Sequence, residues 1–202
     1  MPSNQRKNVQ NRRLERARAF QVIYSLFFSP VDNAKTLARR YLHTLYAEPL
    51  PGDAFVTESE YVLEDDDSER PAALVIGYPQ EEDRANIVVP DLDTETPEGF
   101  TWDLVLGVWQ KQSELDTLIT DFSQNWRTSR MGKVELALLR LAFFELAFRD
   151  DTPPKVIINE AIELSKQFGD DSSRGFVNGI LDAAVKAVET GKIKRASLFW
   201  GK

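Results

Sequence analysis

Three arginines near the N-terminus have the residue type and spacing to bind phosphate. Arg12 and Arg16 are four residues apart and Arg13 and Arg16 are three apart, so a helix carries all three guanidiniums on one face. The guanidinium fork matches phosphate oxygens, and a basic helix start suits contact with an RNA backbone. On or near that face, Gln21 and Tyr24 can hydrogen-bond to or stack on an unpaired base. The alternatives are a solvated basic end and, for Tyr24, a half-buried helix residue.

The sequence lacks the residues that most other kinds of chemistry require. Cysteine is absent and His43 is the single histidine, so thiolate ligands, a thiol nucleophile and a histidine-rich metal site are excluded. The sequence has no P-loop, no dinucleotide fingerprint, no HExxH and no set that one histidine could serve in a catalytic triad. We therefore expect a protein that is not an enzyme and needs no metal or cofactor. No apolar run approaches the roughly 18 residues of a membrane span, which favours a cytoplasmic protein.

Charge is divided unevenly along the chain. The net charge of −7 alone argues against nucleic acid. Residues 52–99, however, hold 15 acidic residues and 2 arginines, whereas residues 1–50 hold 9 basic and 3 acidic residues. The acidity is thus confined to one segment, and the basic N-terminal part is hidden by the average over the whole chain.

Two amphipathic helices joined by a charged turn are predicted over residues 153–190, where apolar residues recur at helical spacing. Pro153 and Pro154 fit a helix start, because a first-turn residue needs no N–H donor. Gly169 stands where a left-handed C-terminal cap would stand. The side-chain oxygens of residues 170–173 can then accept hydrogen bonds from the free amides of the second helix.

Three polar residues interrupt these two helices beside their apolar stripes: Asn159, Glu160 and Asn178. A buried polar group left without a partner costs about 1–3 kcal/mol. We expect a structural hydrogen-bond network between the two helices in preference to a catalytic site.

The remaining chain reads as helical, apart from the acidic segment. Residues 131–149 are apolar nearly all round and predict a long buried helix. The segment 52–99 reads as an insertion. It is either a solvated acidic loop that can include one β-hairpin from residues 72–78 and 86–89, or an acidic strand lying over the basic helix face. Residues 191–202 form a basic tail. The prediction is an all-α single domain over residues 1–202, with about seven helices in two small bundles.

Four ordered segments resemble the NusB family of transcription antitermination proteins: RARAFQVIY at 16–24, VELALLRLAFFEL at 134–146, KVIINEAIELSKQFG at 155–169 and FVNGILD at 176–182. The resemblance implies the NusB fold and RNA binding in transcription antitermination. It further implies pairing with the small-subunit ribosomal protein NusE, binding of the single-stranded boxA element of nascent RNA, and joining of the elongating RNA polymerase. A homodimer is left open.

The resemblance also implies where the surfaces lie. The RNA-binding residues are expected to be Arg12, Arg13, Arg16, Gln21, Tyr24, Ser173, Arg174, Gly175 and Phe176, and the partner-binding residue Glu135. Better-known members carry a lysine at the position of Gly175, so this chain departs from the family there. Two alternatives remain. One is the RNA-binding domain of a ribosomal-RNA methyltransferase, disfavoured because the chain of 202 residues leaves no room for a catalytic domain; the other is a protein-binding helical scaffold without RNA affinity.

Overall fold

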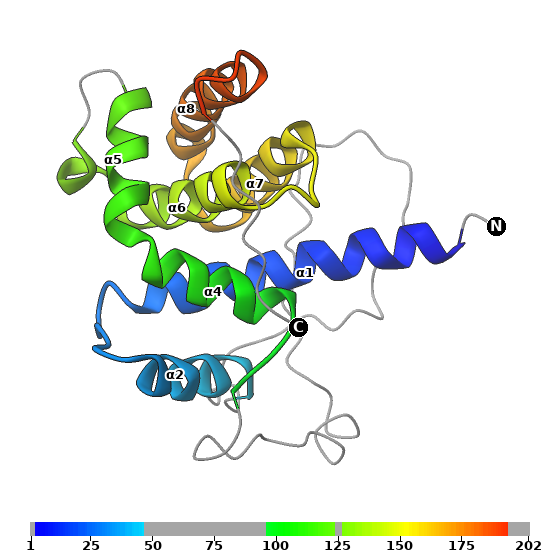
Figure 1. Ribbon diagram of the computed structural model, residues 1–202, viewed down its shortest axis with the longest axis vertical. Coiled ribbons are helices and arrows are strands. Elements are labelled where there is room, and N and C mark those ends of the chain that lie inside the picture. The colour runs from blue at the N-terminus through cyan, green and yellow to red at the C-terminus, as the bar shows by residue number, and fades with distance from the viewer. Residues whose placement is uncertain (1–2, 47–95, 124–126, 194–202) are drawn as a thin grey trace.

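The computed structural model describes residues 3–46, 96–123 and 127–193, and these ranges contain seven α-helices (Figure 1). The helices are α1 (Ser3–Ser25), α2 (Ala34–Tyr46), α4 (Phe100–Gln110), α5 (Gln112–Phe122), α6 (Lys133–Phe148), α7 (Pro154–Phe168) and α8 (Asp171–Glu189), with a 3-10 turn, η2 (Thr128–Arg130), before α6. The predicted all-α fold of about seven helices is confirmed. No helix in the described ranges is long and apolar enough to cross a membrane.

The helices form two groups that share one core. In the first group α4 lies alongside α1, and α2 packs against both (Figure 1). In the second group α7 and α8 pack against each other and against α6, while α5 packs on α6 and α8. Helix α6 also contacts α1 and α4, so it belongs to both groups.

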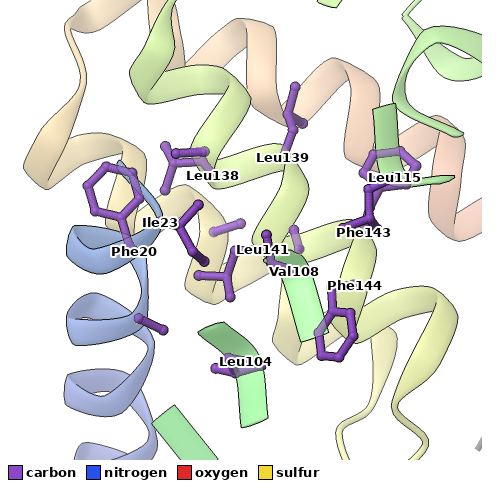
Figure 2. Packing of buried hydrophobic residues seen from close by; sticks show 14 of the residues in the cluster. Phe20, Ile23, Leu104, Val108, Leu115, Leu138, Leu139, Leu141, Phe143 and Phe144 are labelled. Atoms are coloured by element: carbon purple, nitrogen blue, oxygen red, sulfur yellow. The ribbon is translucent and has the colours of Figure 1, made fainter. Parts of the chain in front are cut away.

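Helix α6 is buried over most of its length. Every residue from Leu136 to Phe148 is buried, because strong helix formers and aromatic residues occupy all sides of the helix. The core view shows how neighbouring helices meet it: Phe20 and Ile23 approach from α1, and Leu104 and Val108 from α4 (Figure 2). The predicted buried helix over residues 131–149 is thus confirmed, with its first turn starting at Lys133.

A glycine lets α4 and α6 approach each other closely. A Cβ atom on Gly107 would lie 2.0 Å from Cζ of Phe144, closer than any real contact. Phe144 is fully buried, so it has no free space into which to move. The close packing of these two helices therefore requires glycine at position 107.

The ends of α7 and α8 follow the predicted capping residues, with one exception. Helix α7 begins at Pro154, and Asp170 caps α8 in a box with Ser173, as predicted. The left-handed cap at Gly169 was wrong, because the chain is extended there with φ −102° and ψ 179°. Glycine is needed for another reason: a Cβ would lie 2.6 Å from Cβ of Ser173 and 2.8 Å from the oxygen of Ser165.

Several predictions fall on other parts of the chain. The expected hairpin at 72–78 and 86–89, residues 52–95 of the acidic segment and residues 194–202 of the tail lie outside the described residues. The described chain resumes before α4, where Gly99 has a φ of 103° that glycine adopts without strain.

Candidate nucleic-acid interface

The predicted arginines of α1 point to three different neighbours. Arg16 lies four residues before Phe20 and seven before Ile23, so it continues the apolar stripe of α1 into the core. Its side chain is only 4% exposed and donates from Nε to Oε1 of Glu145 at 2.8 Å and from Nη2 to Oε2 at 2.7 Å. Burial alone would lower the pKa of Arg16, but the Glu145 carboxylate raises it above its ordinary value.

Arg13 pairs with α7. It donates from Nη2 to Oε1 of Glu160 at 2.9 Å and from Nε to Oε2 at 3.1 Å, and the Glu160 side chain is 7% exposed. These hydrogen bonds raise the pKa of Arg13. The expected polar network between α7 and α8 is therefore wrong in its partners: Glu160 bridges α7 to α1, while Asn159 is exposed.

Arg12 joins a cluster at the junction of α6 and α7. Its Nη1 donates to Oδ2 of Asp151 at 3.1 Å, and its guanidinium lies 4.1 Å from the ring centroid of Phe100. Arg149 donates to the same carboxylate from Nε and Nη2, each at 3.0 Å, and lies 4.8 Å from the same ring centroid. The hydrogen bonds of Arg149, aided by those of Arg12, lower the pKa of Asp151 to about 2.

These contacts correct the picture of three exposed arginines. Arg12 and Arg13 keep 39% and 38% of their side chains exposed, but Arg16 is buried and its outward orientation was wrong. RNA contact by the arginines stays a prediction. For Arg16 the geometry favours a structural role, because the fork that would meet phosphate already holds Glu145.

The predicted base-contacting residues lie further along α1. Gln21 and Tyr24 are both half-buried. Tyr24 stacks on Phe20 with ring centroids 5.8 Å apart and meets Phe28 edge-on at 5.2 Å. Phe28 is 60% exposed, with the Lys133 ammonium 4.1 Å from its ring centroid. We call Tyr24, Phe28 and Lys133 the aromatic patch. Rings that are exposed or half-buried in this way can stack on a base or receive a protein partner.

The start of α8 is capped and partly buried. Oδ1 of Asp170 accepts from the Ser172 hydroxyl at 2.6 Å and from the backbone amides of Ser172 and Ser173, both at 2.9 Å. The hydrogen bond from the Ser172 hydroxyl, followed by those from Ser173, lowers the pKa of Asp170 to about 2. Ser173 is 2% exposed, so the expectation that its side chain faces outward was wrong. Arg174 and Gly175 are exposed and Phe176 is half-buried. A Cβ on Gly175 would meet open space, and the residue lies within the helix.

Glu135, the predicted partner-binding residue, is tied to this helix start. Its Oε1 accepts a hydrogen bond from the Ser173 hydroxyl, and its other oxygen packs against Gly132, where a Cβ would lie 2.0 Å away. The carboxylate therefore sits between the first turns of α6 and α8, whose free amides favour an anion. The structure thus brings the predicted partner site and the predicted RNA site at α8 into contact.

Sequence reasoning missed four residues of this surface: Phe28, Phe100, Lys133 and Arg149. Helical periodicity places Arg149 only at the end of a helix, yet an arginine beside two aspartates indicates an ion-pair cluster. Phe28 lies four residues after Tyr24, in the turn that follows α1, and the short separation in sequence keeps the two rings together. Phe100 and Lys133 come into place only through packing between helices. In the described residues no cluster of side chains could hold a metal ion.

Comparison with known proteins agrees with this architecture. A model of the NusB family matches residues 79–186. "Transcription antitermination protein NusB" of Nitratidesulfovibrio vulgaris (strain DSM 19637 / Miyazaki F) is 45% identical over 182 residues, which cover 90% of this chain and 92% of the relative. The protein of the same name from Oleidesulfovibrio alaskensis is 45% identical over 92% of this chain and 94% of its own. The solved structure of T. maritima NusB has a TM-score of 0.55 at 24% identity, covering 87% of this chain and 90% of that one, and supports the fold.

The fold and the matched sequence define an all-α protein with the architecture of NusB. This chain belongs to the NusB family.

The relatives differ in length. The alignment to the Nitratidesulfovibrio protein leaves little of either chain uncovered, so it spans most of the segment 52–99. A relative from Geobacter sulfurreducens is 53% identical over 83 residues, which already make up 60% of its chain, and it is therefore shorter. The acidic segment thus belongs to a long form of the protein that this chain shares with some relatives.

Proposed function

We propose that this protein acts in transcription antitermination, by binding nascent RNA and joining the elongating RNA polymerase. The observation that carries the proposal is the match to relatives named for this activity over about nine-tenths of both chains. We further propose that the RNA is a single-stranded boxA-type element, that the partner is ribosomal protein NusE, and that the complex forms in the cytoplasm.

The charge and exposure of the surface support RNA binding at two places. Arg12 and Arg13 offer partly exposed guanidiniums on α1, and Arg174 and Gly175 present an exposed helix start on α8. Phosphates are drawn to both, by charge at the first and by helix dipole and charge at the second. Gln21 and Tyr24, half-buried on α1, contact unpaired bases in this proposal, with Phe176 near the α8 start.

The aromatic patch and Glu135 support a protein partner. The exposed phenyl ring of Phe28 lies beside Lys133, and the half-buried Glu135 carboxylate lies in the first turn of α6. Together they offer apolar contact and both signs of charge, a combination frequent at protein interfaces. NusE would cover this surface, with a basic side chain meeting Glu135. A homodimer through the same patch is the competing occupant.

Binding to RNA with and without NusE tests the proposal. The protein is titrated with a boxA RNA and with a scrambled RNA of the same composition, at several salt concentrations. We expect boxA to bind more tightly, NusE to increase the preference, and the affinity to fall as salt rises. A protein-binding scaffold would show no RNA affinity at low salt. Equal affinity for both RNAs in the presence of NusE would contradict the proposed function. Light scattering of the free protein tests separately for a homodimer.

The methyltransferase alternative is tested with the same protein. The alignment spans 92% of a relative named for antitermination, so this chain matches nearly all of that protein and not a single module of a longer enzyme. We expect no transfer of a methyl group to ribosomal RNA, and labelled methyl donor incorporated into that RNA would favour the alternative.

A further inference from the structure

One aspartate is held between two arginines from distant parts of the chain, Arg12 on α1 and Arg149 directly after α6. Oδ2 of Asp151 accepts from Nη1 of Arg12 at 3.1 Å and from Nη2 of Arg149 at 3.0 Å, so one oxygen is shared by both guanidiniums. Nε of Arg149 completes a fork on Oδ1 at 3.0 Å. An anionic oxygen at this point is bound by α1 and by the end of α6 at the same time.

The two guanidiniums are fixed in place before any ligand arrives. Both lie over Phe100, with distances to the ring centroid of 4.1 Å for Arg12 and 4.8 Å for Arg149, and the ring is only 9% exposed. Asp103 holds Arg149 from another side, with its Oδ2 3.4 Å from Nη1. A site whose side chains are already ordered loses little rotamer entropy on binding.

Asp151 itself can leave this position without disturbing a helix. It lies in the turn between the end of α6 at Phe148 and the start of α7 at Pro154, and its side chain is 36% exposed. The Glu145 and Glu160 carboxylates that hold the neighbouring arginines are 2% and 7% exposed and sit on helices. Asp151 is therefore the replaceable carboxylate among the three that neutralise the arginines of α1.

We propose that Arg12 and Arg149 form a phosphate subsite, which Asp151 occupies in the free protein and which an RNA phosphate takes over on binding. The inference rests on the proposed RNA binding and adds Arg149 to it as a contact residue. A carboxylate and a phosphate present oxygens of similar geometry to the arginine fork, so the phosphate reproduces the hydrogen bonds that Asp151 gives up. The displaced carboxylate moves into solvent.

Removing the competing charge tests the exchange. Asp151→Asn should tighten binding of both the boxA RNA and the scrambled RNA at low salt by roughly two- to fivefold, the range of an exposed ion pair. The matched control is Asp150→Asn, which removes one charge from the adjacent exposed residue. The proposal fails if the two variants change RNA affinity equally, because the effect is then one of net charge.

Removing the new contact tests the subsite itself. Arg149→Gln should weaken binding to both RNAs and reduce the slope of log affinity against log salt by about 0.7, the value for one phosphate of a single strand. Melting curves of each variant identify a temperature at which every variant is folded, and binding is measured there. Arg149→Lys keeps the charge but loses the fork, so it should restore the salt slope and only part of the affinity.

Combining the substitutions gives the decisive result. In a protein that carries Arg12→Gln and Arg149→Gln, Asp151→Asn should tighten RNA binding no more than Asp150→Asn does. A full gain in that background would overturn the subsite. The phosphate contact does not depend on RNA sequence, so a result that contradicts the subsite appears with both RNAs. A result that contradicts the proposed function appears instead as equal binding of boxA and scrambled RNA by the unmodified protein.

Discussion

Helix α1 and the turn that follows it differ in how much of their chemistry is open to a partner. On the helix, each of Arg12, Arg13 and Arg16 is already held by a carboxylate of this chain. In the turn, the apolar Phe28 is 60% exposed. The basic residues are thus largely satisfied internally while an apolar ring faces solvent, the reverse of what residue type alone indicates. Burial and pairing, more than residue type, decide what a surface offers.

The largest effect should separate buried from exposed arginines. Arg16→Ala leaves Glu145 charged and unpaired in the core and should lower the free energy of unfolding by about 3–5 kcal/mol. Arg12→Ala removes a partly exposed pair and should cost under about 1 kcal/mol. Urea unfolding of both variants measures this.

The double variant Arg16→Met, Glu145→Met, which removes both charges, should recover most of the loss. Equal stability of Arg16→Ala and Arg12→Ala would show that losing the arginine of the core pair costs no more than losing that of an exposed pair.

Reversing the charge of Glu135 tests the surface proposed to bind a protein partner. Glu135→Lys should weaken the heterodimer with NusE by about 2–5 kcal/mol if a basic partner residue meets it. The change also removes the acceptor of the Ser173 hydroxyl and puts a cation between two helix starts, so stability should fall by about 1–2 kcal/mol. Calorimetry of the heterodimer and melting curves measure the two effects.

The matched control is Glu114→Lys, which reverses the same charge at an exposed residue of α5. Unchanged heterodimer affinity for Glu135→Lys would dismiss the partner assignment. Because Glu135 contacts the α8 start, we also expect weaker RNA binding by this variant.

A smaller effect is expected at the open glycine of α8. Gly175→Lys should stabilise the protein by roughly 0.5–1 kcal/mol, because the residue is helical and a Cβ meets open space. It should also steepen the salt slope of RNA binding by up to about 0.7. Gly179→Lys is the control, since it lies in open space on the same helix one turn further from its start. Equal salt slopes for the two variants would remove the α8 start from the RNA site.

The smallest effect concerns the stability of the protein at acid pH. The folded protein lowers the pKa of Asp151 from 3.8 to about 2, so the folded state binds this proton less tightly than the unfolded chain. The contribution of Asp151 to stability is complete above pH 3.8 and is lost as the pH falls towards 2. We expect the stability difference between the protein and Asp151→Asn to be under about 1 kcal/mol at pH 6 and to vanish near pH 2. A difference that persists at pH 2 would contradict the pairing.

Helical periodicity predicted most of the fold, because burial of an apolar stripe decides where helices form. It also held the signal for Arg16, which continues the stripe of Phe20 and Ile23, and for Glu145, which lies inside a helix apolar on all sides. A charged residue at such a position must find a buried partner. That the two partners are each other required the packing of α1 on α6.

The cluster of arginines at Phe100 could not be predicted from the sequence for a similar reason. Arg12, Phe100 and Arg149 come from three distant parts of the chain, and each belongs to a different local pattern. Gly169 shows a further limit: glycine was expected for its left-handed backbone, but it is required by a close approach to Ser173, which no local pattern encodes.

The pair in the core has a consequence for protein synthesis. Arg16 and Glu145 are 129 residues apart, so at about 5–20 residues per second the ribosome makes the arginine roughly 6–26 s before its partner. During that interval the arginine-bearing helix has neither its counter-charge nor the apolar surface of α6 to cover it. Over this time the unfinished chain should be at its most sensitive to proteases and most in need of a chaperone, and docking of α6 should close the period in a single cooperative step.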